Sequence, residues 1–398
     1  MKFISRTAAL IQSGRPGSNR RPEPWQGSAL PTALRPRGSE IYRRNARSAK
    51  VRSQSLAFSP MSSASEARES FFWMGGRLAT GLEEISNDSK DLDRGGFWAV
   101  STTFEGEFLA ARFAEVIDSP FPQSLDPWKK IEDKWHSSLQ ENQYKEYVQA
   151  IQEEILEGWV YQVNACRILS STLHGDLRTL FSELLIKNPA PYSSYLEVPG
   201  LTIASASPEL FLSRQKSTIR TAPIKGTKRL SATEEGFGEK DSAENVMIVD
   251  LMRNDLGRIC VQGSITVPRL LNTENHPGLS HLVSDITGEL VSDVNWSSIC
   301  DALLPPGSVS GAPKSSALEL ISRLESKRRG PYCGALGWVE NDCALLSVAI
   351  RIFWNKGDDA LHFGTGAGIT WGSDAQDEWH ETQLKARHLL SIVGGDFQ

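Results

Sequence analysis

Two pairs of acidic residues carry the first chemical signal in this sequence. Asp241 and Glu244 form one pair, Glu378 and Glu381 form the other, and Lys385 follows Glu381 by four residues. At these spacings the side chains of each pair lie on one face of a helix. Four carboxylates in one cavity would repel one another unless a divalent cation neutralised them, and Mg²⁺ takes one or two carboxylates while retaining waters. The pattern predicts a magnesium site; the alternative is that each pair complements a helix dipole in water.

Two glycine-rich segments resemble phosphate loops, but their spacing is wrong. In segment 307–315, GSVSGAPKS, Ala312 and Pro313 separate the glycine from the lysine that GxxxxGK[ST] requires next to it. Segment 364–369, GTGAGI, lacks the third glycine of GxGxxG, and no acidic residue follows at the ribose distance. Glycine still lets backbone N–H groups approach an anion closely, so both segments remain candidates for carboxylate binding as well as for simple turns.

The elements that must position these residues mix strands and helices without a strict alternation. Hydrophobic periodicity predicts strands at 97–104, 108–113, 161–169, 195–198 and 201–205, and a hairpin from 209–213 and 217–221. It predicts helices at 141–158, 241–253, 315–327 and 377–393. This arrangement favours an α+β architecture with largely antiparallel sheets.

Composition excludes two classes of protein. The 398 residues are 39% hydrophobic and 23% charged, which is enough to build a core, and no apolar run approaches the ~20 residues that a bilayer requires. Residues 1–60 carry a net charge of +10, and residues 61–398 carry −15. A body this acidic would repel a phosphate backbone. We therefore expect no membrane span, and no nucleic-acid binding except through the basic N-terminal tail.

The five cysteines point to a reducing compartment. Their number is odd and no CxxC pair occurs. The pattern predicts reduced, buried thiols of a cytoplasmic protein instead of a disulfide framework or a zinc site. The cysteines are Cys166, Cys260, Cys300, Cys333 and Cys343.

Residues 1–70 are rich in Arg, Ser and Pro and show no hydrophobic periodicity, so we expect a disordered basic tail before a single domain at 71–398. Three accounts of the tail compete: a transit peptide, a polybasic interaction arm, or translated upstream sequence before a start at Met61. We favour the last, because residues 17–19, GSN, are what the tRNA T-loop sequence GGTTCGAAT would encode.

Taken in chain order, the segments from 158 to 387 resemble the chorismate-utilising enzymes. This family includes anthranilate synthase component I, aminodeoxychorismate synthase component I, and the isochorismate and salicylate synthases. The matching stretches are VYQVNACRIL, NPAPYSSYLEV, ASASPELFL, APIKGTKR, KDSAENVMIVDLMRNDLGRI, SHLVSDITGEL, PPGSVSGAPKSSALELI, RRGPYCGALGW, VAIRIFW and FGTGAGITWGSDAQDEWHETQLKA. The resemblance implies an anthranilate synthase component I-like fold, two packed largely antiparallel sheets flanked by helices, with a shortened N-terminal part.

Within this family, two positions separate the reactions. Isochorismate and salicylate synthases have a water-activating lysine where this chain has Gln162, and an amide cannot deprotonate water at neutral pH. Anthranilate synthases have alanine where this chain has Lys225. A lysine there is similar to the aminodeoxychorismate synthases, in which it attacks C2 of chorismate and expels the C4 hydroxyl.

The resemblance makes Lys225 the nucleophile and Glu209 the acid that protonates the departing hydroxyl. Only a neutral amine is a nucleophile, so burial beside Mg²⁺ would have to lower the pKa of Lys225. Glu209 must stay protonated, which an apolar, anion-rich pocket favours. Taken alone, without the resemblance, Lys225 would be interpreted as a surface lysine and Glu209 as a hairpin residue.

The remaining site residues also follow from the resemblance. Glu244 and Glu381 match direct Mg²⁺ ligands, and Asp241 and Glu378 match acidic residues that bind through water. His281 matches a histidine near the C4 hydroxyl, or is a structural histidine. The residues expected to contact substrate are Gln162, Gly226, Thr227, Ser308, Tyr332, Arg351, Gly366, Ala367, Gly368 and Lys385.

The expected reaction therefore joins chorismate and ammonia to give 4-amino-4-deoxychorismate, on the route to p-aminobenzoate and folate. The chain lacks the GxGxCxGxQ elbow of a glutamine amidotransferase, so a separate amidotransferase subunit is implied as its ammonia source. The alternatives are an anthranilate synthase component I and a non-catalytic chorismate-binding paralogue.

Overall fold

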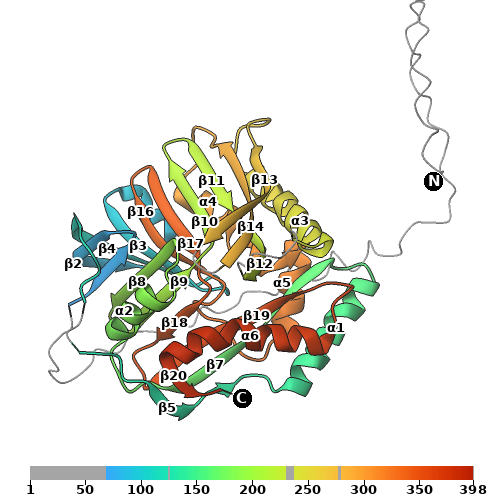
Figure 1. The fold of residues 1–398 in the computed structure, drawn as a ribbon. Coiled ribbons are helices and arrows are strands. Elements are labelled where there is room, and N and C mark those ends of the chain that lie inside the picture. The colour runs from blue at the N-terminus through green and yellow to red at the C-terminus, as the bar shows by residue number, and fades with distance from the viewer. Residues whose placement is uncertain (1–68, 124–125, 230–236, 277–278, 398) are drawn as a thin grey trace, which may run out of the picture. The chain divides into compact units, whose positions relative to one another are not determined.

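A computed structural model describes residues 69–123, 126–229, 237–276 and 279–397, with only the backbone described at 227–229, 275–276 and 279. Within these residues, eighteen strands form one hydrogen-bonded sheet in which neighbouring strands are antiparallel. Figure 1 shows the sheet with β11, β13 and β14 at the top and β7, β19 and α6 at the bottom. The predicted tail at 1–70 falls almost wholly outside the described residues.

The sheet has two halves that meet at β1 (Phe71–Met74), which pairs with β2 on one side and β8 on the other. The β14 half contains β2 (Arg77–Ser86), β3 (Phe97–Thr102), β4 (Phe108–Asp118), β10 (Leu210–Gln215), β11 (Thr218–Ala222), β12 (Ile224–Arg229), β13 (Thr266–His276), β14 (Leu279–Glu289), β16 (Ala335–Glu340) and β17 (Cys343–Val348). The β7 half contains β6 (His136–Ser137), β7 (Gln162–Thr172), β8 (Tyr192–Val198), β9 (Leu201–Ser207), β15 (Gly311–Ala312), β18 (Ile352–Asn355) and β19 (Ala360–Ile369). A separate parallel pair joins β5 (Ile131–Lys134) to β20 (Gly394–Asp396).

Helices cover both halves. The α-helices are α1 (Glu141–Leu156), α2 (Leu177–Lys187), α3 (Glu239–Leu256), α4 (Trp296–Leu303), α5 (Lys314–Leu324) and α6 (Ala375–Val393), and the 3-10 helices are η1 (Ser89–Arg94) and η2 (Gly307–Val309). α3 packs on β14, and α6 packs on β19. Among the residues that the structure describes, no helix is long and apolar enough to cross a bilayer.

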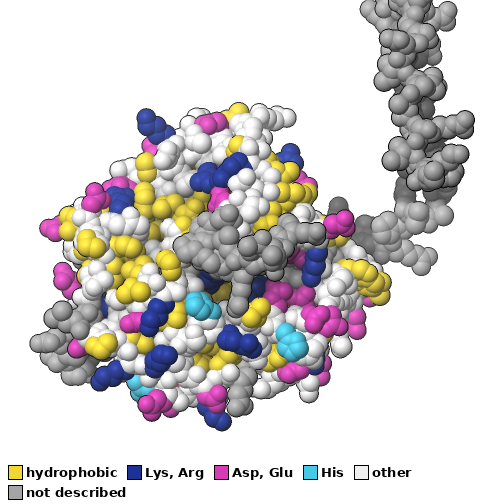
Figure 2. Space-filling view, in the orientation of Figure 1, with side chains coloured by type: hydrophobic (Ala, Val, Ile, Leu, Met, Phe, Trp, Pro, Cys, Tyr) yellow, Lys and Arg dark blue, Asp and Glu magenta, His cyan; other side chains and the backbone are white. Residues whose placement is uncertain are grey.

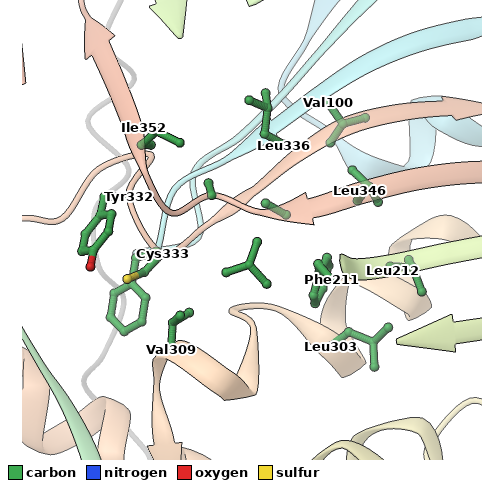
Figure 3. Packing of buried hydrophobic residues seen from close by; sticks show 14 of the residues in the cluster. Val100, Phe211, Leu212, Leu303, Val309, Tyr332, Cys333, Leu336, Leu346 and Ile352 are labelled. Carbon is green, nitrogen blue, oxygen red and sulfur yellow. The ribbon is translucent and has the colours of Figure 1, made fainter. Parts of the chain in front are cut away.

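The largest core cluster lies between the two halves of the sheet. Val100 and Leu336 come from the β14 half, Ile352 from the β7 half and Val309 from η2, and each is at most 6% exposed. Figure 3 shows these side chains with other buried residues of the cluster. Truncating a leucine in such a core to alanine typically costs about 2–5 kcal/mol. This packing fixes the two halves against each other and so fixes the segments that run along their seam.

Helix α6 illustrates how local sequence aims a site residue. The side chain of Asp374 caps the helix by accepting hydrogen bonds from the backbone N–H groups of Gln376 and Asp377. Apolar and small residues then recur at spacings of three and four along one buried face. Glu378 lies on that face and is only 4% exposed, so the acidic residue at the start of the helix points inward.

The predicted fold class is confirmed, and the two predicted sheets are the halves of one continuous sheet, because β1 hydrogen-bonds to both. The predicted hairpin forms from β10 and β11. The helix predicted at 315–327 ends at Leu324, since Glu325 has left the helical conformation and its side chain holds other segments. The expectation of five buried thiols is wrong for Cys300 and Cys343, which are only partly buried; all five are free.

Candidate active site

Lys225 and Glu209 meet beside η2. Lys225 lies on β12, and its Nζ donates a 2.9 Å hydrogen bond to the carbonyl oxygen of Ser308 in η2. Glu209 directly precedes β10 and is 4% exposed. The charges of Lys225 and Glu209 act on each other. Three segments separated in sequence therefore bring the predicted nucleophile and the predicted acid into one neighbourhood.

One carboxylate oxygen of Glu209 is left without a partner. Its Oε1 is buried, and no group in the described part of the chain donates a hydrogen bond to it. Burial raises the pKa of Glu209, and the raised value is only partly offset by hydrogen bonding to Ser308 and Ile224 and by the charges of Lys225 and Arg351. A raised pKa keeps more of this carboxyl protonated, as a general acid requires.

The pKa of Lys225 moves in the opposite direction. Burial lowers it; the nearby carboxylates of Glu209 and Glu244 oppose the change, and Lys385 adds to it. A lowered pKa increases the fraction of neutral amine, which is the nucleophilic form. The two opposite directions are those expected from the sequence, while the catalytic roles stay predictions.

A bulge in β12 sets the place of Lys225. The register between β12 and β14 shifts between Lys225 and Thr227, and Gly226 adopts a φ of 78° there. A Cβ at Gly226 would lie 2.8 Å from the Phe237 ring and 3.1 Å from Cγ of Asp241. Glycine is therefore needed both for the backbone conformation and for the close approach of α3.

The neighbours of this bulge include two more predicted site residues. His281 lies on β14 directly opposite Thr227 and is 2% exposed. Ser308 is 5% exposed. The side chain of Thr227 lies outside the described atoms, so its predicted contact with the ring of the substrate stays a prediction, as does the role of His281.

The two predicted direct metal ligands come from α3 and α6. Burial raises the pKa of Glu244, helped by the charges of Glu381 and Glu378 and opposed by Lys225 and Lys240. The carboxylate of Glu244 makes no hydrogen bond or ion pair within the described residues. Glu381 instead pairs with Lys385 at 2.6 Å, and this charge lowers its pKa against the effect of burial.

The two predicted indirect ligands are held by protein groups. Glu378 Oε1 accepts a 2.6 Å hydrogen bond from the hydroxyl of Ser373 and lies 3.5 Å from Nζ of Lys240. Asp241 Oδ2 accepts a hydrogen bond from the backbone N–H of Gly238 at 3.3 Å. In the described part of the chain, no three acidic, histidine or cysteine side chains surround one point at metal-ligand distances. The carboxylates are thus neighbours that lysines partly neutralise.

The glycine-rich segment 364–369 lies on β19, which pairs with β7. A Cβ at Gly366 would lie 2.7 Å from Sγ of Cys166, and one at Gly368 would lie 2.4 Å from Nε2 of Gln162. The carbonyl oxygen of Gly366 accepts a 3.1 Å hydrogen bond from Nζ of Lys385. Ala367 is fully buried in the core cluster, so its predicted contact with the substrate stays a prediction.

Arg351 and Tyr332 are predicted to bind a carboxylate, and Tyr332 lies against the glycine segment. The Arg351 guanidinium makes no hydrogen bond or ion pair with another described residue; burial lowers its pKa, and Glu209 opposes that change. Burial raises the pKa of Tyr332 well above its ordinary value, so its hydroxyl stays neutral and can donate. A Cβ at Gly364 would lie 2.1 Å from the Tyr332 ring, so glycine leaves the space that the ring fills.

Acidic side chains gather on the surface near the start of α6. Figure 2 shows a group of acidic side chains, with basic ones among them, where Figure 1 places the start of α6 beside α1. A hollow of about 1080 Å³ runs along α6 as far as Gly394 and Phe397, and among the predicted site residues Glu381 alone lines it. The hollow is therefore mostly separate from the Lys225 site.

Lys240 and Ser373 contact Glu378 and were not predicted from the sequence. A signal for Lys240 existed, because a basic residue in the first turn of a helix opposes the helix dipole and needs another reason to be there. Nothing in the local sequence marks Ser373, which adjoins the capping residue Asp374.

Comparison with known proteins gives a consistent result. Residues 102–391 match the model of the chorismate binding enzyme family. Anthranilate synthase component 1 of Saccharolobus solfataricus is 36% identical over 65% of this chain and 64% of its own length. Aminodeoxychorismate synthase component 1 of Escherichia coli is 38% identical over 64% of this chain and 58% of its own length.

The chain thus spans about three fifths of the length of these curated relatives. Among solved structures, anthranilate synthase component I from Streptococcus pneumoniae superposes with a TM-score of 0.70 over 83% of this chain and 95% of that chain, at 20% identity. This likeness extends the agreement in fold to most of the described domain.

Proposed function

Because the chain belongs to the chorismate binding enzyme family, we propose that it converts chorismate and ammonia into 4-amino-4-deoxychorismate with loss of water. The observation that carries the proposal is the partly buried Lys225, whose lowered pKa and 2.9 Å hydrogen bond to Ser308 accompany a buried Glu209 with a raised pKa. Groups with opposite pKa shifts are the arrangement that a paired nucleophile and acid require.

In the proposed first step the neutral amine of Lys225 attacks C2 of chorismate. The ring double bonds shift, the bond from C4 to its hydroxyl breaks, and the proton of Glu209 goes to the departing oxygen to form water. Ammonia then attacks C4, the double bonds shift back, and the bond from C2 to Lys225 breaks to restore the neutral amine. The new ammonium group on C4 returns a proton to the carboxylate of Glu209. The unpartnered Oε1 of Glu209 supports this role, because that oxygen is free to face the substrate.

Substrate binding in this proposal uses the unpaired cation beside the acid. The Arg351 guanidinium has no partner among the described residues, and a fork of N–H donors suits a planar carboxylate. Tyr332 and the backbone of residues 366–368 complete the proposed pocket for the enolpyruvyl carboxylate. We also assign Lys385 to the binding of a substrate carboxylate, and the hydrogen bond from its Nζ to the carbonyl oxygen of Gly366 supports this assignment.

Glu244 and Glu381 are the residues that would hold Mg²⁺, with Asp241 and Glu378 acting through water. The carboxylate of Glu244 lacks a protein partner within the described residues, and two carboxylates are enough for an ion that keeps several waters. Bound there, Mg²⁺ would neutralise the ring carboxylate of chorismate.

Water is disfavoured as the nucleophile because position 162 holds an amide. Gln162 is 2% exposed and its Oε1 has no hydrogen-bond donor among the described groups. Ammonia is proposed to come from a separate glutamine amidotransferase subunit in the cytoplasm, since both relatives named above are designated component 1. The five free cysteines support a reducing location.

The test is product analysis. Purified protein is incubated with chorismate, Mg²⁺ and ammonium, and the products are separated by chromatography. We expect 4-amino-4-deoxychorismate from the wild type, a fall of at least about 10³-fold for Lys225→Ala, and no change for the exposed control Lys187→Ala. Full activity of Lys225→Ala would contradict the covalent role.

A second candidate is an anthranilate synthase, favoured by the 36% identity to that enzyme of Saccharolobus solfataricus. It would place the amino group at C2 and release pyruvate. Fluorescent anthranilate, formed without an added lyase, would identify this reaction. A chain that binds chorismate and forms no product would instead be a non-catalytic paralogue.

A further inference from the structure

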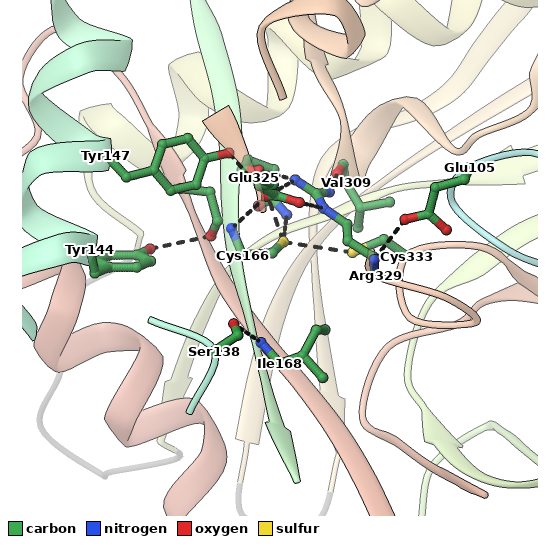
Figure 4. A network of polar contacts seen from close by, with 12 residues as sticks. Glu105, Ser138, Tyr144, Tyr147, Cys166, Ile168, Val309, Glu325, Arg329 and Cys333 are labelled. Atoms are coloured by element: carbon green, nitrogen blue, oxygen red, sulfur yellow. Dashed lines mark hydrogen bonds and ion pairs between the residues drawn. The ribbon is translucent and has the colours of Figure 1, made fainter. Parts of the chain in front are cut away.

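Arg329 connects three segments that border the proposed site. The residue is 1% exposed. Its Nη1 donates to the carbonyl oxygen of Val309 at 3.0 Å, and its Nη2 donates to the carbonyl oxygen of Asn164 at 2.6 Å. The guanidinium also lies 4.0 Å from the ring centroid of Phe104. Figure 4 shows this network between β7, η2 and the segment that follows α5.

A carboxylate locks the orientation of this guanidinium. Glu325 receives hydrogen bonds from Nε of Arg329 at 2.8 Å and from Nη2 at 2.7 Å, which is a bidentate pair. Glu325 Oε1 also accepts from the hydroxyl of Tyr147 and from the backbone N–H of Cys166. The backbone N–H of Arg329 donates in turn to Glu105 at 2.6 Å. Both the side chain and the backbone of Arg329 are therefore fixed.

Each segment that Arg329 holds carries a residue of the proposed site. Val309 follows Ser308, whose carbonyl oxygen accepts the hydrogen bond from Lys225. Asn164 lies two residues after Gln162 on β7. Tyr332 follows Arg329 by three residues. The carbonyl groups of 308 and 309 are consecutive, so fixing the second one fixes the direction of the first.

We propose that Arg329 is a positioning residue for catalysis: it holds the carbonyl groups of Val309 and Asn164 so that Ser308 and, through it, the amine of Lys225 point at the substrate. The inference rests on the proposed function in so far as Lys225 is the nucleophile. A displacement of about 1 Å at the reacting amine is enough to lower a rate by about 10²-fold.

Lysine cannot replace this arginine. The planar fork reaches Glu325, Val309 and Asn164 at once, whereas an ammonium keeps the charge but offers its donors from a single nitrogen. Arg329→Lys therefore preserves the ion pair with Glu325 and releases the two carbonyl groups. With the carbonyl of Ser308 released, the amine of Lys225 is free to pair with Glu209 or Glu244 and becomes more protonated.

The experiment compares Arg329→Lys with Arg178→Lys. The control residue is partly buried and pairs with a buried glutamate, with Nε 2.7 Å from Oε2 of Glu197, but on α2 and β8, away from the site. Four quantities are measured: kcat and KM for chorismate consumption, whatever the product; the melting temperature; and the rate at which acetic anhydride acetylates Lys225, read by mass spectrometry against the exposed Lys187.

For Arg329→Lys we expect kcat to fall about 10²-fold with KM changed less than about fivefold, and Lys225 to be acetylated more slowly than in the wild type. For Arg178→Lys we expect wild-type kcat and labelling despite a similar loss of melting temperature. Wild-type kcat or unchanged labelling in Arg329→Lys, or equal losses of kcat in both variants, would overturn the proposal.

A second variant covers the case in which Arg329→Lys does not fold. Glu325→Gln keeps one acceptor for Arg329 and removes the charge that orients it, and we expect about a tenfold fall in kcat with slower labelling of Lys225. Should this variant match the wild type in both readouts, the proposal fails. If the wild type consumes no chorismate, the proposed function fails, while the labelling comparison still decides the positioning of Lys225.

Discussion

Arg329 and Arg351 border the same site, and the fold treats them in opposite ways. Arg329 donates four side-chain hydrogen bonds and is 1% exposed. Arg351 has neither a hydrogen bond nor an ion pair with any described residue, and burial lowers its pKa. An uncompensated charge in a partly buried place costs free energy that a bound anion would recover. Arg329, whose guanidinium nitrogens all donate hydrogen bonds within the protein, therefore holds the surrounding segments in place. Arg351, whose donors have no partner among the described residues, is suited to bind a ligand.

The largest expected effect is the loss of stability when Arg329 is replaced. Arg329→Met leaves Glu325 buried without its cation, so we expect the free energy of unfolding to fall by about 3–5 kcal/mol. Urea denaturation followed by tryptophan fluorescence measures it. A loss below about 1 kcal/mol would mean that the network around Arg329 contributes little to the fold.

Arg351→Met should weaken ligand binding without loss of stability. Loss of a bidentate contact to a carboxylate is expected to weaken chorismate binding about 100-fold, since hydrogen bonds to charged groups contribute about 1.5–3 kcal/mol each. The free energy of unfolding should stay unchanged or rise, because no protein partner is lost. Isothermal titration and urea denaturation check the two halves of this prediction. Tight binding combined with a destabilised fold would erase the contrast between the two arginines.

Glu209→Gln should change how the stability of the protein depends on pH. The pKa of Glu209 is raised in the folded protein, so the folded state holds a proton that the unfolded state has released once pH exceeds the ordinary value for glutamate. The contribution of protonated Glu209 to the free energy of unfolding is thus complete at low pH. It is lost as the pH rises through the raised pKa. The wild type should lose more stability between about pH 5 and pH 8 than Glu209→Gln does. Parallel curves of unfolding free energy against pH would contradict the raised pKa.

The smallest expected effect concerns the carboxylates. Glu244 has no protein partner among the described residues, so Glu244→Gln should leave the melting temperature without Mg²⁺ almost unchanged. The wild type should gain a few degrees when Mg²⁺ is added, by mass action, and Glu244→Gln and Glu381→Gln should not. Equal gains in all three proteins would show that Mg²⁺ acts elsewhere. Ser242→Ala, on the same helix, serves as a matched control that keeps the gain.

How much of the site could be predicted from sequence depends on how local each contact is. The carboxylate pairs on α3 and α6 follow from a spacing of three residues within one helix, and their helices form as expected. Lys225 and Glu209 could be singled out only through the family resemblance, because a lysine on one strand and a glutamate just before another carry no periodic signal. Their meeting depends on the antiparallel pairing of β10, β11, β12 and β14.

Arg329 shows what sequence reasoning cannot reach. Glu325 and Arg329 are four residues apart, a spacing typical of an exposed helical ion pair worth a few tenths of a kcal/mol. The helix ends before either residue, and three distant segments bury the pair. The difference between a surface pair and a buried network is therefore decided by tertiary packing.

Peptide mapping tests directly whether neutral Lys225 forms a covalent bond to the substrate. Protein mixed with chorismate and Mg²⁺ without ammonia is quenched rapidly, digested and examined by mass spectrometry. We expect a substrate-derived mass on the peptide that contains Lys225. This mass should disappear when ammonium is added and should be absent from Lys225→Ala. An unmodified Lys225 peptide in protein that still turns over chorismate once ammonium is supplied would contradict it.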